Sequence, residues 1–242
     1  MDKLPVNKQR RSLLCAAAAS ALAGMLPLQA RASNPLKIGI IGSGRVGGAL
    51  GQSWARSGHS VMFSSLDLDS DRKLAASVGA NARAGTPREA AAFGDILLIA
   101  VPYGALPKLG KDLGDLLKGK PVIDTCNPFP NRDGEIATWA REKGAGLASA
   151  ELLPGARIVR AFNAIGYARM AEAAKRTGPA IGMPMAGDDV DALAMATRLV
   201  RDAGYEPVLV GGLVMGKHLM PGTPLAGEQS PEQLRKVAAT LS

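Results

Sequence analysis

One aliphatic run, Asp95 to Val101 (DILLIAV), limits the fold more than any other segment of this 242-residue chain. Branched aliphatic residues without polar alternation are typical of a strand buried on both faces of a parallel sheet. Parallel strands need crossover connections, which are usually helices. The run therefore predicts an α/β protein whose helices cover both faces of a mostly parallel sheet.

The chain from Pro35 onward repeats a rhythm of aliphatic run, glycine turn and helical spacing. The further predicted strands are Leu36 to Ile41, Val61 to Phe63, Pro121 to Thr125, Arg157 to Phe162, Pro179 to Met185 and Glu206 to Val210. Helices are predicted to begin near Arg45, Gly104, Asp189 and Pro231. The Gly/Pro-rich segment from Gly211 to Glu228 predicts a loop before the last helix. The alternation predicts a single, doubly wound, Rossmann-like domain that binds ligands at the carboxyl ends of its strands.

A glycine-rich motif, G-x-G-x-x-G, stands between the first predicted strand and the first predicted helix. This context supports dinucleotide binding, because the helix N-terminus attracts a pyrophosphate. Gly42 permits the turn, Gly44 lets the backbone approach the phosphates, and Gly47 lets the helix pack closely on the strand. The predicted pyrophosphate-binding residues are Gly42, Ser43, Gly44, Arg45, Val46 and Gly47.

The end of the second predicted strand bears on the choice between NAD and NADP. Ser64 and Ser65 can donate hydrogen bonds to a 2′-phosphate and favour NADP, whereas Asp67 and Asp69 oppose it. The nearby cations are Arg45, Arg72 and Lys73. We expect NADP and leave NAD open.

The first 32 residues have the order of an export signal. The twin arginines Arg10 and Arg11 precede an alanine-rich stretch, and an A-x-A site ends at Ala32. The segment resembles a twin-arginine signal and implies a periplasmic protein of residues 33–242. The alternative is a membrane anchor, because residues 12–30 carry no charge. No second long apolar run follows, so no stable membrane span is expected after cleavage.

Composition argues against several other classes of protein. Aromatic residues make up only 4% of the chain, and part of the formal charge of +8 lies in the N-terminal segment, so nucleic-acid binding is not expected. No CxxC pair, HExxH motif or spaced acidic cluster indicates a metal site. A homodimer is compatible with this fold size.

Six segments together resemble a known family. In order, they read KIGIIGSGRVGGAL, GHSVMFSS, DILLIAVP, KPVIDTCNP, LLPGARIVRAFNAIG and AGDD. They resemble the NADP-dependent oxidoreductases of the coenzyme F(420) reductase type over residues 36 to about 215. The resemblance implies that NADPH passes hydride to a deazaflavin or flavin.

The resemblance also implies roles for individual residues. Gly42 to Val46 would hold the pyrophosphate, and Ser64 and Ser65 would form the 2′-phosphate turn, although Leu66 replaces the arginine that normally follows. The residues lining the path to the nicotinamide would be Ala100, Val101, Pro102, Asn127 and Pro128. The floor of the acceptor pocket would be Ala161, Phe162 and Asn163.

The few candidate acids and bases suit this chemistry, because hydride transfer between ring cofactors needs mainly proximity and alignment. We expect no catalytic acid or base. His59 is interpreted as a surface or capping residue, His218 as a solvated loop residue with reach into the pocket as the alternative, and Cys126 as a small buried side chain. Asp124 is expected to form a turn. The competing hypothesis is a non-catalytic, exported dinucleotide-binding module or a subunit of a membrane redox system of the ferric-reductase type.

Overall fold

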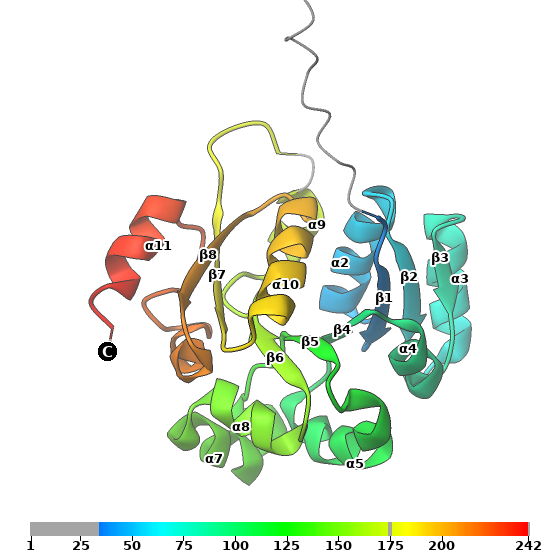
Figure 1. Cartoon of the computed structure of the whole chain (residues 1–242), viewed down its shortest axis with the longest axis horizontal. Coiled ribbons are helices and arrows are strands. Elements are labelled where there is room, and N and C mark those ends of the chain that lie inside the picture. The colour runs from blue at the N-terminus through cyan, green and yellow to red at the C-terminus, as the bar shows by residue number, and fades with distance from the viewer. Residues whose placement is uncertain (1–33, 174–175, 242) are drawn as a thin grey trace, which may run out of the picture. The chain divides into compact units, whose positions relative to one another are not determined.

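Eight strands form one sheet in the computed structural model, which describes residues 34–173 and 176–241. The spatial order is β3-β2-β1-β4-β5-β6-β7-β8 (Figure 1). The strands are β1 Lys37–Ile41, β2 Ser60–Ser64, β3 Ala82–Ala84, β4 Ile96–Ile99, β5 Pro121–Asp124, β6 Arg157–Arg160, β7 Gly182–Gly187 and β8 Glu206–Gly211. Neighbouring strands are parallel except β6 and β7. The predicted doubly wound, mostly parallel sheet is confirmed, and the predicted export signal lies outside the described residues.

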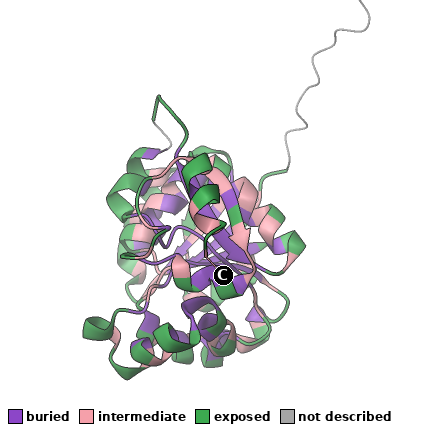
Figure 2. Cartoon of the chain, turned by 90° about the vertical axis from the view of Figure 1, so that its left-hand side faces the viewer, coloured by how far each residue is buried: buried purple, intermediate pink, exposed green. Residues whose placement is uncertain are grey.

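Helices cover both faces of this sheet. They are α2 Arg45–Arg56, α3 Leu68–Val78, α4 Pro87–Phe93, α5 Leu106–Leu117, α6 Pro130–Asp133, α7 Glu135–Lys143, α8 Ala145–Leu152, α9 Tyr167–Ala173, α10 Val190–Asp202 and α11 Pro231–Ala238. Residues of α2, α9 and α10 pack in one hydrophobic core, and residues of α5, α7 and α8 pack in a second. The strands are largely buried between the exposed outer surfaces of these helices (Figure 2).

The aliphatic run that predicted the fold contributes to both cores through β4. Ile96 and Leu98 belong to the core of α2 and α10, whereas Leu97 and Ile99 belong to the core of α5 and α8. None of the four is more than 1% exposed. This strand is therefore buried on both faces, as its composition predicts.

Two side-chain hydrogen bonds connect α2 and the loop that follows it with α10. The Trp54 indole donates to the Leu199 carbonyl at 2.7 Å. The Leu36 amide donates to His59 Nδ1 at 3.1 Å, so His59 Nε2 carries the proton that bonds Asp202 at 2.8 Å. His59 is 1% exposed, and its interpretation as a surface residue was wrong, because these two partners satisfy both ring nitrogens inside the domain.

Three parts of the fold differ from the expectations or go beyond them. The strand expected at Pro179 to Met185 is β7, and it runs antiparallel to β6. The loop expected from Gly211 to Glu228 contains the 3₁₀ helix η2 (Leu213–His218), because Leu213 packs in the second core and Met215 packs in a third cluster with Leu234 of α11. The short edge strand β3 has the sequence Ala-Arg-Ala, which gives no strand pattern. Among the described residues, no helix is long and apolar enough to cross a membrane.

Candidate functional site at the carboxyl edge of the sheet

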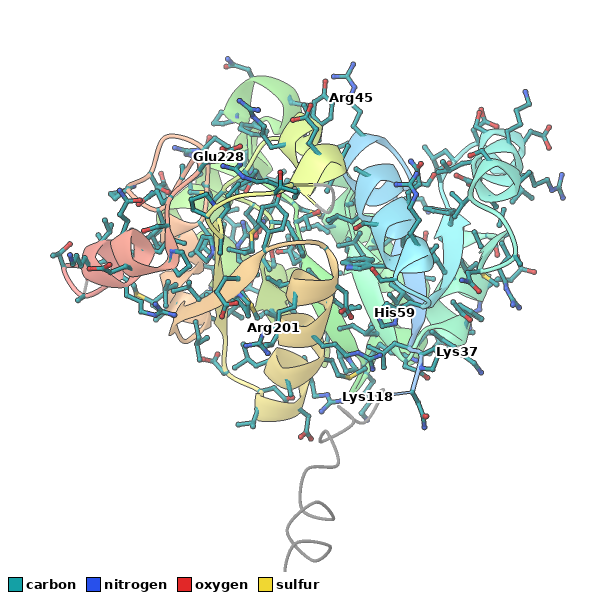
Figure 3. The ribbon with its side chains drawn as sticks, turned by 90° about the horizontal axis from the view of Figure 1, so that it is seen from above. Lys37, Arg45, His59, Lys118, Arg201 and Glu228 are labelled. Atoms are coloured by element: carbon teal, nitrogen blue, oxygen red, sulfur yellow. The ribbon has the colours of Figure 1, made fainter. Side chains whose placement is uncertain are left out.

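The glycine motif lies at the point where the strand order reverses. β1 pairs with β2 on one side and β4 on the other, and α2 begins directly after the turn that follows β1. In Figure 3, Arg45 and Glu228 lie on one side of the molecule, and Lys37 and Lys118 lie on the other. Because Lys37 begins β1 and Arg45 follows it, the side of Arg45 is the carboxyl edge, where open α/β sheets bind ligands.

The motif's glycines meet different local requirements. Gly42 has φ of +98°, and a Cβ there would lie 2.3 Å from the Ala100 carbonyl oxygen. A Cβ at Gly47 would lie 2.1 Å from the Gly42 carbonyl oxygen. In contrast, a Cβ at Gly44 would have no atom within 4 Å. The first two positions need glycine for the turn and for close packing, whereas Gly44 faces open space.

The N-terminus of α2 is free to receive an anion. Its N-cap residue, Gly44, supplies no side-chain hydrogen bond, and the first turn contains no acidic residue. The first-turn N–H groups that lack intrahelical partners, together with the helix dipole, attract phosphate groups. Arg45 in this turn stacks on the Tyr167 ring at 5.1 Å from its centroid, so a cation lies beside the loop.

The predicted 2′-phosphate serines have different roles in the structure. Ser64 is fully buried, and its hydroxyl donates to the Ile40 carbonyl at 2.6 Å. Its carbonyl accepts the Gly42 and Ser43 amides at 2.9 and 3.1 Å, so Ser64 shapes the glycine turn. The Ser65 hydroxyl donates to Asp71 at 2.9 Å.

The segment after β4 lies against the glycine turn, as the predicted nicotinamide path requires. The Ala100 amide donates to the Ile41 carbonyl at 2.9 Å. A Cβ at Gly42 would lie 2.9 Å from the Val101 side chain. Pro102 follows at the surface, as the N-cap of the 3₁₀ helix η1 (Tyr103–Ala105). These three residues are therefore brought together with the glycine motif.

The ends of β5 and β6 are joined by hydrogen bonds between two asparagines and an arginine. The Asn127 amide group donates to the Asn163 carbonyl at 2.8 Å, and its Oδ1 accepts from Arg160 at 3.2 Å. The Asn163 side chain is 3% exposed, and neither of its polar atoms has a partner in the described chain. A buried amide with a free donor and a free acceptor is unusual, and it marks the end of β6 as a candidate polar contact for a ligand.

A buried ion pair supports these asparagines. Arg160 and Asp124 are both fully buried, and their side chains lie 2.6 Å apart. Arg160 also donates to the Cys126 carbonyl at 3.1 Å, and Asp124 accepts the Cys126 amide at 2.8 Å. The pair thereby fixes the backbone that leads to Asn127. Asp124 does form a turn, as expected, but sequence reasoning missed Arg160, whose only signal was a charge within an aliphatic run.

The expected acceptor floor is only partly available to a ligand. Phe162 has φ of +64° and is 2% exposed. Its ring packs edge-on between Trp54 and Tyr205, with centroids 6.1 Å away in each case. The interpretation of Phe162 as pocket floor is therefore wrong for its side chain, because the backbone turn directs the ring into the core. Ala161 is also fully buried, so Asn163 is the polar member of this trio.

The other candidate reactive groups are Cys126, His59 and His218, and His218 lies at the end of η2 with its buried Nε2 unpartnered among the described residues. Cys126 is 2% exposed, and burial raises the pKa of its thiol well above the usual value. Burial and the neighbouring Lys217 lower the pKa of His218, which favours the neutral imidazole. His59 is committed to its structural partners. Cys126 is thus the small buried side chain that was expected.

A small cavity lies beside α9 on the same side of the molecule. Its volume is about 200 Å³, below the usual range for ligand pockets. It is lined by Arg169, Glu172, Ala173, Arg176, Ile181 and Glu228. Glu228 pairs with Arg169 at 3.2 Å and with Arg176 at 3.3 Å. The charged residues that line the cavity therefore largely pair with one another.

A family model matches the part of the chain that contains the glycine motif. Residues 37–128 match the family described as NADP oxidoreductase coenzyme F(420)-dependent. The match extends from the start of β1 to Pro128, so it covers most of the strand ends described above. A comparison with curated proteins found no match.

Solved structures share the fold at low sequence identity. A hypothetical protein, SMa0349, from Sinorhizobium meliloti has a TM-score of 0.67 at 24% identity, covering 82% of this chain and 96% of its own. A candidate F(420)-dependent NADP-reductase from Arthrobacter sp. FB24 has a TM-score of 0.62 at 20% identity, with coverages of 75% and 87%. Mycobacterium tuberculosis 3-hydroxyisobutyrate dehydrogenase gives 0.54 at 20% identity, but only 57% of that protein is covered. The chain thus has the α/β fold of NAD(P)-dependent oxidoreductases.

Proposed function

We propose that this chain binds a nicotinamide dinucleotide along the carboxyl edge of its sheet and transfers hydride between it and a deazaflavin or flavin. The observation that carries this proposal is the uncapped N-terminus of α2 behind the open Gly44. The family match over residues 37–128 supports the same reaction class. When bound, the reduced nicotinamide supplies the hydride.

The chain's own residues would bind and align the reactants. The first-turn N–H groups of α2 would hold the pyrophosphate, and Arg45 would add positive charge. The segment from Ala100 to Pro102 lies against the glycine turn, so it would guide the dinucleotide toward Asn127. Asn163 is joined to Asn127 and presents an unpaired amide, which suits an acceptor with alternating N–H and carbonyl groups.

A substitution at Gly44 tests the pyrophosphate site without disturbing the fold. Gly44→Leu introduces a side chain into open space, so the domain should keep its stability while losing at least about tenfold in dinucleotide affinity. The affinities for NADH and NADPH are measured with the full chain by titration calorimetry. Gly114→Leu in α5 is the matched control, because a Cβ there also meets no atom within 4 Å. Unchanged affinity in Gly44→Leu would contradict the assignment.

Turnover separates the enzyme from the alternative of a binding module. Oxidation of NADH and NADPH is followed by the loss of absorbance of the reduced nicotinamide, with coenzyme F(420) and then with FMN as acceptor. Acceptor-dependent oxidation supports the proposed hydride transfer. Tight binding without turnover would favour a non-catalytic dinucleotide-binding module that works with a redox partner.

We further propose that the N-terminal segment directs export through the twin-arginine pathway to the periplasm. The sequence features in favour are the Arg10-Arg11 pair, the alanine-rich stretch and the A-x-A site. Replacing both arginines by lysine keeps the charge but removes the recognised pair, so the protein should remain in the cytoplasm of the expressing cell. Fractionation and immunoblotting measure this result. Unchanged export would contradict the pathway, and an uncleaved, membrane-bound chain would favour the anchor.

A further inference from the structure

The turn between β2 and α3 contains a buried carboxylate that bears on which dinucleotide the site accepts. Asp71 is 1% exposed, although it belongs to the first part of a surface helix. Its carboxylate accepts hydrogen bonds from Ser43 in the glycine motif and from Ser65 after β2, the second at 2.9 Å. Asp71 therefore joins the two segments between which a Rossmann fold places the adenosine ribose.

This carboxylate occupies the hydroxyl donors that a 2′-phosphate would need. A serine hydroxyl has a single proton to donate. The Ser65 proton is directed at Asp71, and the Ser64 proton is directed at the Ile40 carbonyl inside the sheet. The Ser64 hydroxyl is buried inside the sheet, and turning the Ser65 hydroxyl toward a phosphate would remove one of the two hydroxyl donors of the buried Asp71, which is unfavourable.

The surrounding charges also disfavour a phosphate. No ion pair formed among the described residues includes Asp71, so neutral hydroxyls hold its charge. Arg72 is directed at Asp69, in a pair that is 65% and 79% exposed. Leu66, directly after the serines, is fully exposed and brings no charge to the turn. A phosphate at this turn would meet the carboxylates of Asp67 and Asp71, whereas the following cation Arg72 is already paired with Asp69.

We infer that Asp71, together with the apolar Leu66, makes the site selective for NAD(H) over NADP(H). A carboxylate near the adenosine ribose repels a 2′-phosphate even where, like that of Asp71, it is buried and bonded to serine hydroxyls. The inference rests on the proposed dinucleotide site. From the sequence, Ser64 and Ser65 favoured NADP. The structure favours NAD instead, because both serine hydroxyls donate to groups within the protein.

The experiment compares the affinities of the full chain for NADH and NADPH at low ionic strength. We expect NADH to bind about tenfold more tightly or better, since like charges at close range are strongly unfavourable. Leu66→Arg should improve NADPH binding at least about fivefold with little change for NADH, because it adds a cation at an exposed position. Leu66→Gln is the control of similar size without the charge.

A second variant tests Asp71 directly. Asp71→Asn keeps the shape and an acceptor oxygen but removes the charge, so the ratio of the NADPH and NADH dissociation constants should fall toward one. Equal or tighter binding of NADPH by the unmodified chain would overturn the selectivity while leaving the proposed function intact. Binding of neither dinucleotide would overturn both. If the ratio of the two dissociation constants is unchanged in both Leu66→Arg and Asp71→Asn, these residues do not cause the selectivity.

Discussion

At the scale of single residues, Arg160 carries a buried charge that only its partner Asp124 balances among the described residues. It lies fully buried beside Asp124, and the pair holds the backbone carbonyl of Cys126 and the side chain of Asn127. A buried ion pair contributes little compared with an apolar replacement, but removal of one partner leaves an uncompensated charge. The pair therefore makes the end of β5 rigid, and its integrity is needed for the position of Asn127.

Asp124→Asn should destabilise the domain by about 3–5 kcal/mol, because Arg160 then remains buried without a counter-charge. The free energy of unfolding is measured by urea denaturation. The control is Asp115→Asn, which breaks the Arg88–Asp115 pair, where both side chains are more than half exposed. That control should change stability little. A comparable loss in both variants would contradict the special role of the buried pair.

Replacement of Tyr205 is expected to increase the stability of the domain, in contrast to replacement of Asp124. Its hydroxyl is buried without a partner in the described residues, and burial raises the pKa of Tyr205 to about 12. Tyr205→Phe should therefore stabilise the domain by about 1 kcal/mol at neutral pH, since an unsatisfied buried group is removed.

The alkaline behaviour of the same variant follows from the raised pKa. In the unfolded chain the tyrosine ionises near its ordinary value of 10.0, before the folded tyrosine does. Ionisation of Tyr205 therefore costs the folded state nothing below pH 10, and it lowers the free energy of unfolding progressively as the pH rises from 10 toward 12. Unfolding free energies measured from pH 8 to 12 should fall less steeply in Tyr205→Phe. An unchanged slope would mean that Tyr205 ionises alike in both states.

At the scale of elements, patterns within single segments were enough to predict most strands and the glycine motif. The continuous apolar composition of β4 and the position of the motif between β1 and α2 depend on local sequence alone. The direction of β7 does not, because it is set by pairing with β6 and β8. The same holds for η2, whose buried Leu213 and Met215 are apolar without helical or strand periodicity.

The parts of the candidate site that the backbone forms could be predicted from the sequence, whereas the parts that depend on side-chain contacts were harder to predict. The strand ends at Gly42, Ala100 and Asn127 follow from topology, since parallel strands bring their carboxyl ends to one edge. The inward turn of Phe162 and the hydroxyl commitments of Ser64 depend on atoms from distant segments. No local sequence pattern predicts those contacts.

At the scale of the whole molecule, the reversal of β7 determines how the chain closes its own site. β7 and β8 run against β6, so the segment after β8 must return across the domain to reach the carboxyl edge. It does so near its end, where the Gly227 amide donates to the Ala164 carbonyl at 2.9 Å. On the way, Gly216 packs so closely on Arg160 that a Cβ there would lie 2.6 Å from its side chain.

This route has a consequence for the order of assembly during synthesis. The ribosome releases β1, the glycine motif and β4 long before residues 213–227, and N-terminal segments are the first to become available for folding. The half of the site that would hold the nucleotide can therefore form early, whereas the contacts over Arg160 and Ala164 form only after residues 213–227 have been synthesised. Until then Arg160 lacks its close contact with Gly216, so residues 213–227 complete the surroundings of the Arg160–Asp124 pair at the end of β6.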